Sequence, residues 1–229
     1  MITLKGVSKK YGNLEVLNKV DLTISENKII GLVGVNGSGK TTIIKLINGI
    51  LKPSGGEILI NGEKPGLESK KIISYLPENN CLDLNMKIKE LVKLFSDFYL
   101  DFDTETAKKL LNNFKIDINK KLKNLSKGTK EKVQLALVIS RRADVYILDE
   151  PISGVDPATR DSILDTILSN FNENATMLIS THLISDVERI LDEVIFVGEG
   201  KIILHENTDE LRKKRNKSID QIFREEFKC

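Results

Sequence analysis

The sequence predicts an α/β fold: a mostly parallel sheet, an antiparallel β subdomain at the N-terminal end, and an inserted helical subdomain. Three observations support this prediction. Short alternating apolar and polar runs fill residues 2–24, apolar strand patterns alternate with helical patterns over 145–204, and residues 85–123 have helical periodicity with few β-branched runs. Strands that alternate with helices along the chain imply that the sheet of the core is mostly parallel.

The first part of the chain combines strands with one helix. Residues 2–5 and 20–24 are expected to form antiparallel strands on either side of a turn at 11–13, and the apolar run 28–33 follows them. Isoleucines at helical spacing then predict a helix that Pro53-Ser54-Gly55-Gly56 ends before a strand at 57–60; these are Ile43, Ile44, Ile47 and Ile50.

The later elements complete the core. Residues 145–148 form the apolar run of a buried parallel strand, and Asp156-Pro157 then provides an N-cap with proline at the first helical position. The strands expected after that helix lie at 176–180, 193–197 and 201–204, the last of them antiparallel. We expect one domain over 1–229, with a core at about 1–77 and 143–205, a helical subdomain at about 78–142 and a tail at about 206–229.

Composition limits the function classes. The 229 residues carry a net charge of +2 with acidic and basic residues interspersed, so the charge does not indicate nucleic acid as a partner. No apolar stretch approaches the roughly 18 to 20 residues that cross a bilayer, and the polar start is not a secretion signal, so we expect a cytoplasmic chain. Cys81 and Cys229 are expected to be reduced thiols without a catalytic role.

Residues 34–41 read Gly-Val-Asn-Gly-Ser-Gly-Lys-Thr, a complete phosphate-binding loop after an apolar run. Its glycines let backbone N–H groups turn toward a phosphate, and the helix that starts at Lys40 directs its positive dipole end at the same anion. The Lys40 ammonium then meets the β- and γ-phosphate oxygens, and the Thr41 hydroxyl binds Mg²⁺. Nucleotide binding is assigned here to Asn36, Gly37, Ser38, Gly39, Lys40, Thr41 and Thr42.

Two adjacent carboxylates, Asp149 and Glu150, end the apolar strand at 145–148. In α/β sheets, ligands bind at the carboxyl ends of the strands. We therefore expect Asp149 to hold Mg²⁺ through its water shell, and Glu150 to face the water that attacks the γ-phosphorus as a general base.

Between these motifs lies Leu125-Ser126-Lys127-Gly128-Thr129-Lys130, an N-cap followed by the helix expected at 131–141. The order of phosphate loop, helical insert, Leu-Ser-x-Gly and Leu-Asp-Glu-Pro closely resembles the nucleotide-binding subunits of ABC transporters over essentially the whole chain. The resemblance implies the ABC ATPase version of the P-loop NTPase fold, with ATP and Mg²⁺ as its ligands. It also implies that Tyr11 stacks on adenine and that His182 lies near the γ-phosphate. Ser126 and Gly128 would bind the γ-phosphate of the ATP held by the opposite subunit, and the loop 153–156 with Asp156 would link the two ATP sites of the dimer.

This chain departs from the family pattern at two places. Glu78 stands where the family most often has glutamine, and its carboxylate can still reach Mg²⁺ or the attacking water. Lys127 and Thr129 replace a glycine and a glutamine of the signature loop. Both departures, and the tail segment 218–223, are similar to the ABC-2 type branch of small exporters for antibiotic resistance and peptides, which favours export.

The resemblance therefore implies Mg-ATP hydrolysis by a head-to-tail dimer, with catalysis assigned to Lys40, Glu78, Glu150 and His182. A homodimer is favoured because both half-sites look competent. The chain is expected to lie on the inner face of the cell membrane through a separate integral membrane permease. Two alternatives stay open: a soluble ABC ATPase of iron–sulfur assembly, and an ATP-dependent regulatory switch. The sequence does not specify the cargo.

Overall fold

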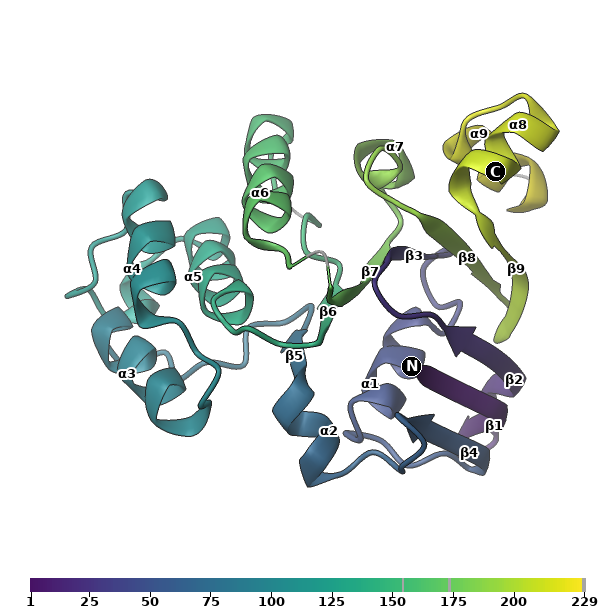
Figure 1. Ribbon diagram of the computed structural model, residues 1–229, viewed down its shortest axis with the longest axis horizontal. Helices are drawn as coiled ribbons and strands as arrows, with labels where there is room; N and C mark the ends of the chain where they lie inside the picture. The colour runs from purple at the N-terminus through teal and green to yellow at the C-terminus, as the bar shows by residue number, and fades with distance from the viewer. Residues whose placement is uncertain (154, 173, 228–229) are drawn as a thin grey trace.

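The computed structural model describes residues 1–153, 155–172 and 174–227, and these form two sheets (Figure 1). The smaller sheet is antiparallel, with the order β2-β1-β4, and consists of β1 (Ile2–Tyr11), β2 (Leu14–Ile24) and β4 (Gly55–Ile60). The larger sheet has the order β5-β6-β7-β3-β8-β9, and β9 alone runs antiparallel to its neighbour. Its strands are β3 (Ile29–Val33), β5 (Ile73–Leu76), β6 (Val145–Asp149), β7 (Thr176–Thr181), β8 (Glu193–Gly198) and β9 (Lys201–Asn207).

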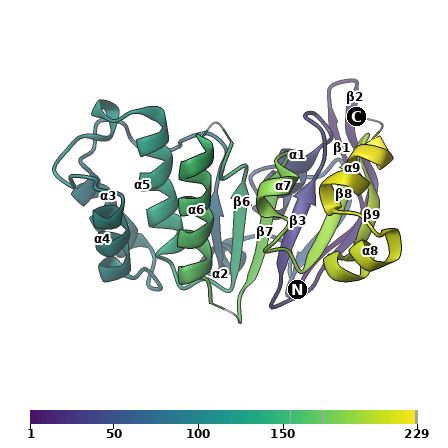
Figure 2. The same cartoon turned by 90° about the horizontal axis from the view of Figure 1, so that it is seen from above.

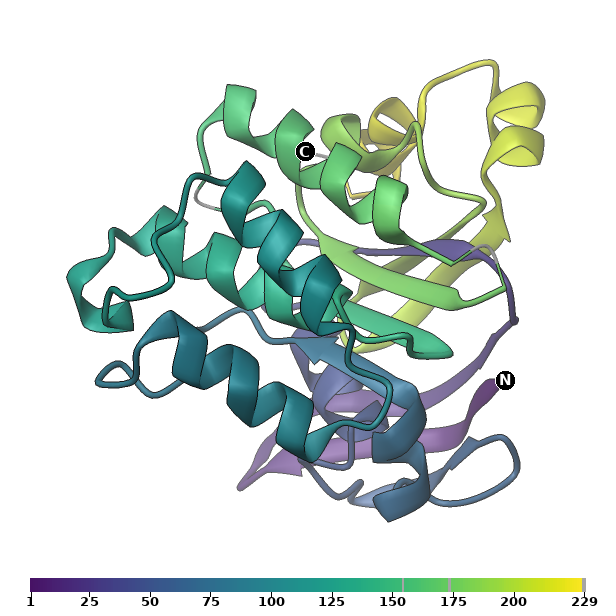
Figure 3. The same ribbon diagram turned by 60° about the vertical axis from the view of Figure 1, so that its left-hand side comes forward.

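Helices cover the sheets from several sides. Helices α3, α4 and α5 stand together at one end of the molecule, and the view in Figure 3 brings them forward. Helices α8 and α9 lie at the opposite end, beside β9. The helices are α1 (Lys40–Ile47), α2 (Leu67–Ile72), α3 (Ile88–Phe98), α4 (Thr104–Asn113), α5 (Lys127–Ile139), α6 (Pro157–Asn170), α7 (Ile184–Val187), α8 (Thr208–Arg215) and α9 (Ile219–Phe227), with a 3₁₀ turn at Leu122–Asn124. We keep 78–142 as the proposed extent of the helical subdomain.

The two faces of the large sheet enter different parts of the core, because successive strand residues point to opposite faces. On β6, Val145 and Ile147 pack with α1 and the small sheet, whereas Tyr146 and Leu148 pack with the helices α3–α6. Figure 2 shows α6, α7 and α9 along that second face. The strands are thus buried on both sides, which explains their nearly continuous apolar runs.

Two helix boundaries in the structure differ from those that the sequence predicts, and residues at the helix ends explain the difference. The helix after the phosphate loop ends at Ile47, because Asn48 caps it and Gly49 adopts the left-handed conformation with φ +65°; Ile50 lies beyond the end and is 57% exposed. Helix α5 begins at Lys127, four residues earlier than expected, since the Ser126 hydroxyl accepts the Thr129 N–H at 3.3 Å. Helix α2 and strand β5 were not predicted.

A buried arginine joins the helical region to the edge of the large sheet. The Arg141 side chain is 4% exposed, and its Nη2 lies 3.0 Å from Asp101 Oδ2 in the connection between α3 and α4. Its guanidinium also donates to the Ile73 and Lys71 carbonyl oxygens, each at 2.6 Å, and stacks on the Tyr99 ring. One side chain therefore fixes the connection between α3 and α4 against β5.

We expect Arg141→Leu to lower the free energy of unfolding by about 3–5 kcal/mol, because it leaves the Asp101 carboxylate without its buried partner. Arg142→Leu is the matched control: it breaks the neighbouring pair with Asp103, but the Arg142 side chain is 79% exposed and the expected loss is below about 1 kcal/mol. Urea denaturation of both variants measures the difference. Equal losses of unfolding free energy in the two variants would show that Arg141 does not fix the connection between α3 and α4 against β5.

Candidate functional site

The phosphate loop connects the buried strand β3 to helix α1, and its glycines are required by space as well as conformation. Gly39 caps α1 with φ +110°, and a Cβ there would lie 2.7 Å from Leu17 Cδ2. A Cβ on Gly34 would lie 2.3 Å from the Val197 carbonyl oxygen. These glycines let the loop pack closely against β2 and β8, which holds its backbone at the helix N-terminus, where anions bind.

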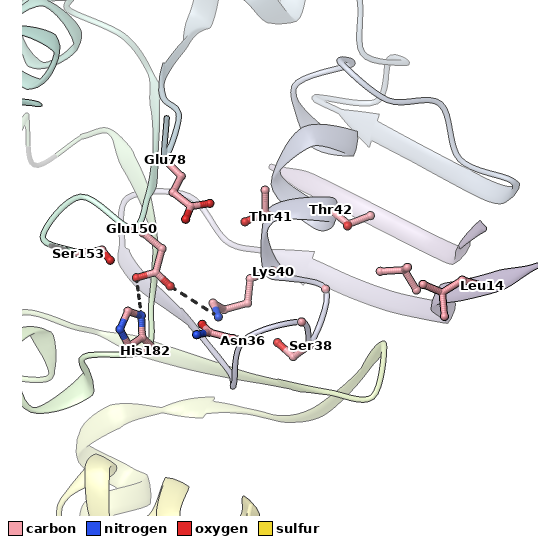
Figure 4. A pocket seen from close by; sticks show the side chains of 13 residues that line it. Leu14, Asn36, Ser38, Lys40, Thr41, Thr42, Glu78, Glu150, Ser153 and His182 are labelled. Carbon is pink, nitrogen blue, oxygen red and sulfur yellow. Dashed lines mark hydrogen bonds and ion pairs between the residues drawn. The ribbon is translucent and has the colours of Figure 1, made fainter. Parts of the chain in front are cut away.

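The loop forms one wall of a cavity of about 500 Å³. Figure 4 shows that Lys40, Thr41 and Asn36 meet Glu78, Glu150 and His182 there, from four separate parts of the chain. Among the residues that the structure describes, the lining consists of Leu14, Val16, Asn36, Gly37, Ser38, Gly39, Lys40, Thr41, Thr42, Glu78, Glu150, Ser153 and His182. The cavity thus combines a phosphate loop with two carboxylates and an imidazole.

Lys40 is the one lysine or arginine among the described lining residues, and its side chain is 6% exposed. Its ammonium donates to the Gly34 carbonyl oxygen at 2.7 Å and lies 3.6 Å from Glu150 Oε1. A phosphate group that enters the cavity therefore meets a buried cation already directed at the loop.

Glu150 is held in a strained backbone conformation between two partners. Its φ of +53° is left-handed, a conformation that costs free energy for a non-glycine residue and is typical of functional sites. The backbone N–H donates to the Ser180 carbonyl at 3.2 Å and to the Ser180 hydroxyl at 3.0 Å. The side chain is 8% exposed, and Oε2 lies 2.9 Å from His182 Nδ1 (Figure 4). Glu150 thus faces the cavity with Lys40 on one oxygen and His182 on the other.

Asp149 is not one of the lining residues given above, but it contacts Thr41, which is. Its Oδ1 accepts from the Ser180 hydroxyl at 2.6 Å and from the Thr41 hydroxyl at 3.3 Å. Burial raises the pKa of the Asp149 carboxyl above its usual value. The Thr41 hydroxyl with the Asp149 and Glu78 carboxylates is an all-oxygen donor set, which fits Mg²⁺. Within the described residues, no three His, Cys, Asp or Glu side chains gather into a metal cluster.

Four residues assigned from the sequence lie elsewhere in this chain. Tyr11 is 46% exposed and is not part of the cavity lining given above; its contact with adenine stays a prediction. Ser126, Gly128 and Asp156 do not belong to that lining either, and Gly154 and Cys229 fall outside the described residues. Leu14 and Val16 of β2 do line the cavity, and sequence reasoning missed them because an apolar residue beside a strand turn carries no functional signal.

Comparison with known proteins agrees with this geometry. Residues 17–153 match the family model described as ABC transporter. The ABC transporter ATP-binding protein YtrB of Bacillus subtilis (strain 168) is 35% identical over 217 residues, covering 93% of this chain and 74% of YtrB.

The chain belongs to the ABC transporter family of ATP-binding proteins. This ABC ATPase is also similar to the lantibiotic transport ATP-binding protein SrtF of Streptococcus pyogenes, with 31% identity over 91% of this chain and 92% of SrtF. The structure of an ATP-binding subunit of an ABC transporter superposes with a TM-score of 0.86 at 27% identity, covering 98% of each chain.

A second similar structure was solved with nucleotide bound. A dimeric ATP-binding cassette in a post-hydrolysis state, bound to ADP and Pi, matches with a TM-score of 0.79 at 25% identity, over 90% of this chain and 98% of that one. The predicted fold class, family and ATPase activity are therefore confirmed. In the part of the chain that the structure describes, no helix is both long enough and apolar enough to cross a membrane.

Proposed function

We propose that this ABC ATPase hydrolyses Mg-ATP to drive export of a drug, peptide or similar small cargo through a separate membrane-spanning permease. The observation that supports hydrolysis most directly is the placement of Glu150 between Lys40 and His182 in the phosphate-loop cavity. Export is supported by the similarity to SrtF and by the ABC-2 features of the sequence.

The residues of the cavity have distinct roles in this proposal. The Lys40 ammonium exchanges the Gly34 carbonyl for phosphate oxygens, and the loop N–H groups bind the remaining oxygens. Glu150 takes the proton of the attacking water, and His182 orients the Glu150 carboxylate through Nδ1. Thr41, Asp149 and Glu78 would hold Mg²⁺, which neutralises phosphate charge when bound. Catalysis thus rests on positioning and charge neutralisation.

A second subunit is needed to complete each site. Ser126 and Gly128 lie at the N-terminal end of α5 and outside the cavity lining of their own chain, so they are free to meet nucleotide held by a partner. Ser126 caps α5, which directs a positive dipole end away from the helix. Because one chain carries both a phosphate loop and a signature loop, we favour a homodimer.

The permease is proposed to dock in a second cleft, of about 420 Å³, between α1, β5 and α3. Its walls are mainly apolar and include Ile50, Phe95 and Tyr99, with Lys45 and Lys70 at the side. Ile50 is 57% exposed although it is a large apolar residue. In this proposal a short amphipathic helix of a membrane subunit covers these side chains and holds the chain at the inner face of the membrane.

We expect Ile50→Asp to uncouple transport from hydrolysis. Loss of one buried apolar contact, roughly 1.5–3 kcal/mol, corresponds to docking weakened about 10- to 100-fold. Basal ATPase of the isolated chain should stay within about twofold, since a surface substitution away from the cavity is usually near neutral. Ile203→Asp, at a 49% exposed position on β9, is the matched control and should change neither transport nor hydrolysis. Equal loss of transport and basal hydrolysis in Ile50→Asp would contradict this docking site.

The proposed function is tested by isolating the tagged chain from its host and identifying what co-purifies from detergent-solubilised membranes. An integral membrane protein in fixed stoichiometry supports the exporter. A chain recovered in the cytosol with soluble partners instead supports an iron–sulfur assembly ATPase or a regulatory switch.

A further inference from the structure

A small polar cavity lies behind the catalytic carboxylates, on the side of helix α5. It has a volume of about 70 Å³ and is bounded by residues 76–79 at the end of β5, by residues 149–151 and Ser153 at the end of β6, and by one face of α5. Lys127, Glu131 and Gln134 form that face, at the i, i+4 and i+7 spacing that aligns side chains on a helix. We call it the α5 cavity.

Gln134 is a polar residue in an otherwise apolar segment of α5. Residues 133–139 are all buried, and Gln134 is the single polar residue among apolar ones. Its side chain is 3% exposed. Packing alone does not explain an amide here, because an apolar residue of the same size fills such a position without the cost of desolvating a polar group.

Three buried polar atoms of this region have no hydrogen-bond partner among the described residues: Gln134 Nε2, Glu131 Oε2 and Asp149 Oδ2. The Gln134 Nε2 is a hydrogen-bond donor and the two carboxylate oxygens are acceptors, so a water molecule can accept from the amide and donate to the carboxylates. A cavity needs about 10–15 Å³ to hold a water molecule and two to four polar groups to bind it, and the α5 cavity meets both conditions.

We propose that Gln134 is a positioning residue for ATP hydrolysis: through water in the α5 cavity it links helix α5 to the free oxygen of Asp149. The Thr41 and Ser180 hydroxyls already bind the other oxygen, Asp149 Oδ1. With the water link, both oxygens of Asp149 are held, and this fixes the end of β6 next to Glu150.

The position of the link explains what it does. Helix α5 begins with the signature residues Ser126 and Gly128, and Gln134 lies about two turns further along the same helix. Another polar contact between α5 and the large sheet, from the Ser74 hydroxyl to the Val138 carbonyl at 2.8 Å, lies a turn beyond Gln134. The link at Gln134 therefore connects the half of α5 that faces the partner subunit to the strand that carries the base.

The test compares Gln134→Leu with the wild-type chain in steady-state ATP hydrolysis. Leucine nearly matches the size of glutamine but cannot bind water, so kcat should fall by about tenfold. KM and nucleotide affinity should stay within about twofold, because the substitution leaves the phosphate loop intact. The melting temperature should change little, because leucine removes the cost of burying an amide while water can still bind the Asp149 and Glu131 oxygens.

Controls separate positioning from structural damage. Ser140→Ala removes a buried hydroxyl at the C-cap of α5, one that donates to the Ala136 carbonyl, and should leave kcat unchanged. Gln134→Asn keeps a shorter amide and should recover part of kcat; it replaces the leucine variant if that variant does not fold. A high-resolution wild-type structure should show water bound to Gln134 Nε2 and Asp149 Oδ2. Unchanged kcat in Gln134→Leu, or a direct protein partner for the amide in that structure, would overturn the proposal.

Discussion

Replacing Glu150 by glutamine is expected to lower the rate of ATP hydrolysis by about 10²–10⁴-fold, the usual contribution of a positioned general base. Glutamine has the same size and its amide oxygen can still accept from His182 Nδ1, which lies 2.9 Å from Glu150 Oε2. The amide cannot take a proton from water at neutral pH, so the chemical step fails while the phosphate loop stays intact. ATP should then hold the closed dimer, because the step that opens it no longer occurs.

Two measurements on Glu150→Gln decide this prediction. Phosphate release gives the rate, and size-exclusion chromatography with and without Mg-ATP gives the fraction of dimer. Glu193→Gln is a matched control, since Glu193 is also a buried carboxylate with a lysine and a histidine as partners, Lys28 and His205, but lies at the opposite end of the sheet. It should hydrolyse ATP within about twofold of wild type. Ready hydrolysis by Glu150→Gln would assign the base to another residue.

The fold was predictable where a local pattern determines the structure. The apolar run at 145–148 and the strands at 176–180 and 193–197 appear as β6, β7 and β8, because a strand buried on both faces must be apolar along its length. Strand β5 was missed because Ile73–Leu76 is short and contains Ser74 and Tyr75, whose place in the sheet depends on pairing with β6. Helix α1 was predicted too long because Ile50 continues the helical spacing after Gly49 has ended the helix.

The site was predictable to the extent that motifs encode it. The phosphate loop is contiguous, so its residues could be assigned before any contact was known. The pairing of Thr41 with Asp149 joins residues 108 positions apart, and only the motif order indicated it. No motif gave the left-handed backbone of Glu150 or the buried amide of Gln134, because both depend on neighbours from other elements. Leu14 and Val16 were missed because an apolar residue near a strand turn carries no motif, and only the fold brings them to the cavity.

Lys40→Ala is expected to weaken ATP binding by about 10- to 100-fold, because a hydrogen bond to a charged group contributes roughly 1.5–3 kcal/mol and each 1.4 kcal/mol is tenfold. The ammonium is already buried and bonded to the Gly34 carbonyl at 2.7 Å, so little entropy is lost when it turns to phosphate. Alanine removes that donor, and no other lysine or arginine belongs to the described lining of the cavity.

The effect of Lys40→Ala is measured most simply as a change in thermal stability on adding nucleotide. A ligand at about 100 times its Kd stabilises the folded chain by roughly 2.7 kcal/mol, so wild-type protein at that ATP concentration should show a clear rise in Tm. The same ATP concentration is only about 1–10 times the expected Kd of Lys40→Ala, which leaves roughly 0.4–1.4 kcal/mol of stabilisation, so at least about half of the rise should disappear. Lys52→Ala, an exposed lysine soon after α1, should keep the full shift. A full shift in Lys40→Ala would mean that the loop backbone alone holds the phosphates, and that Lys40 serves the chemical step rather than binding.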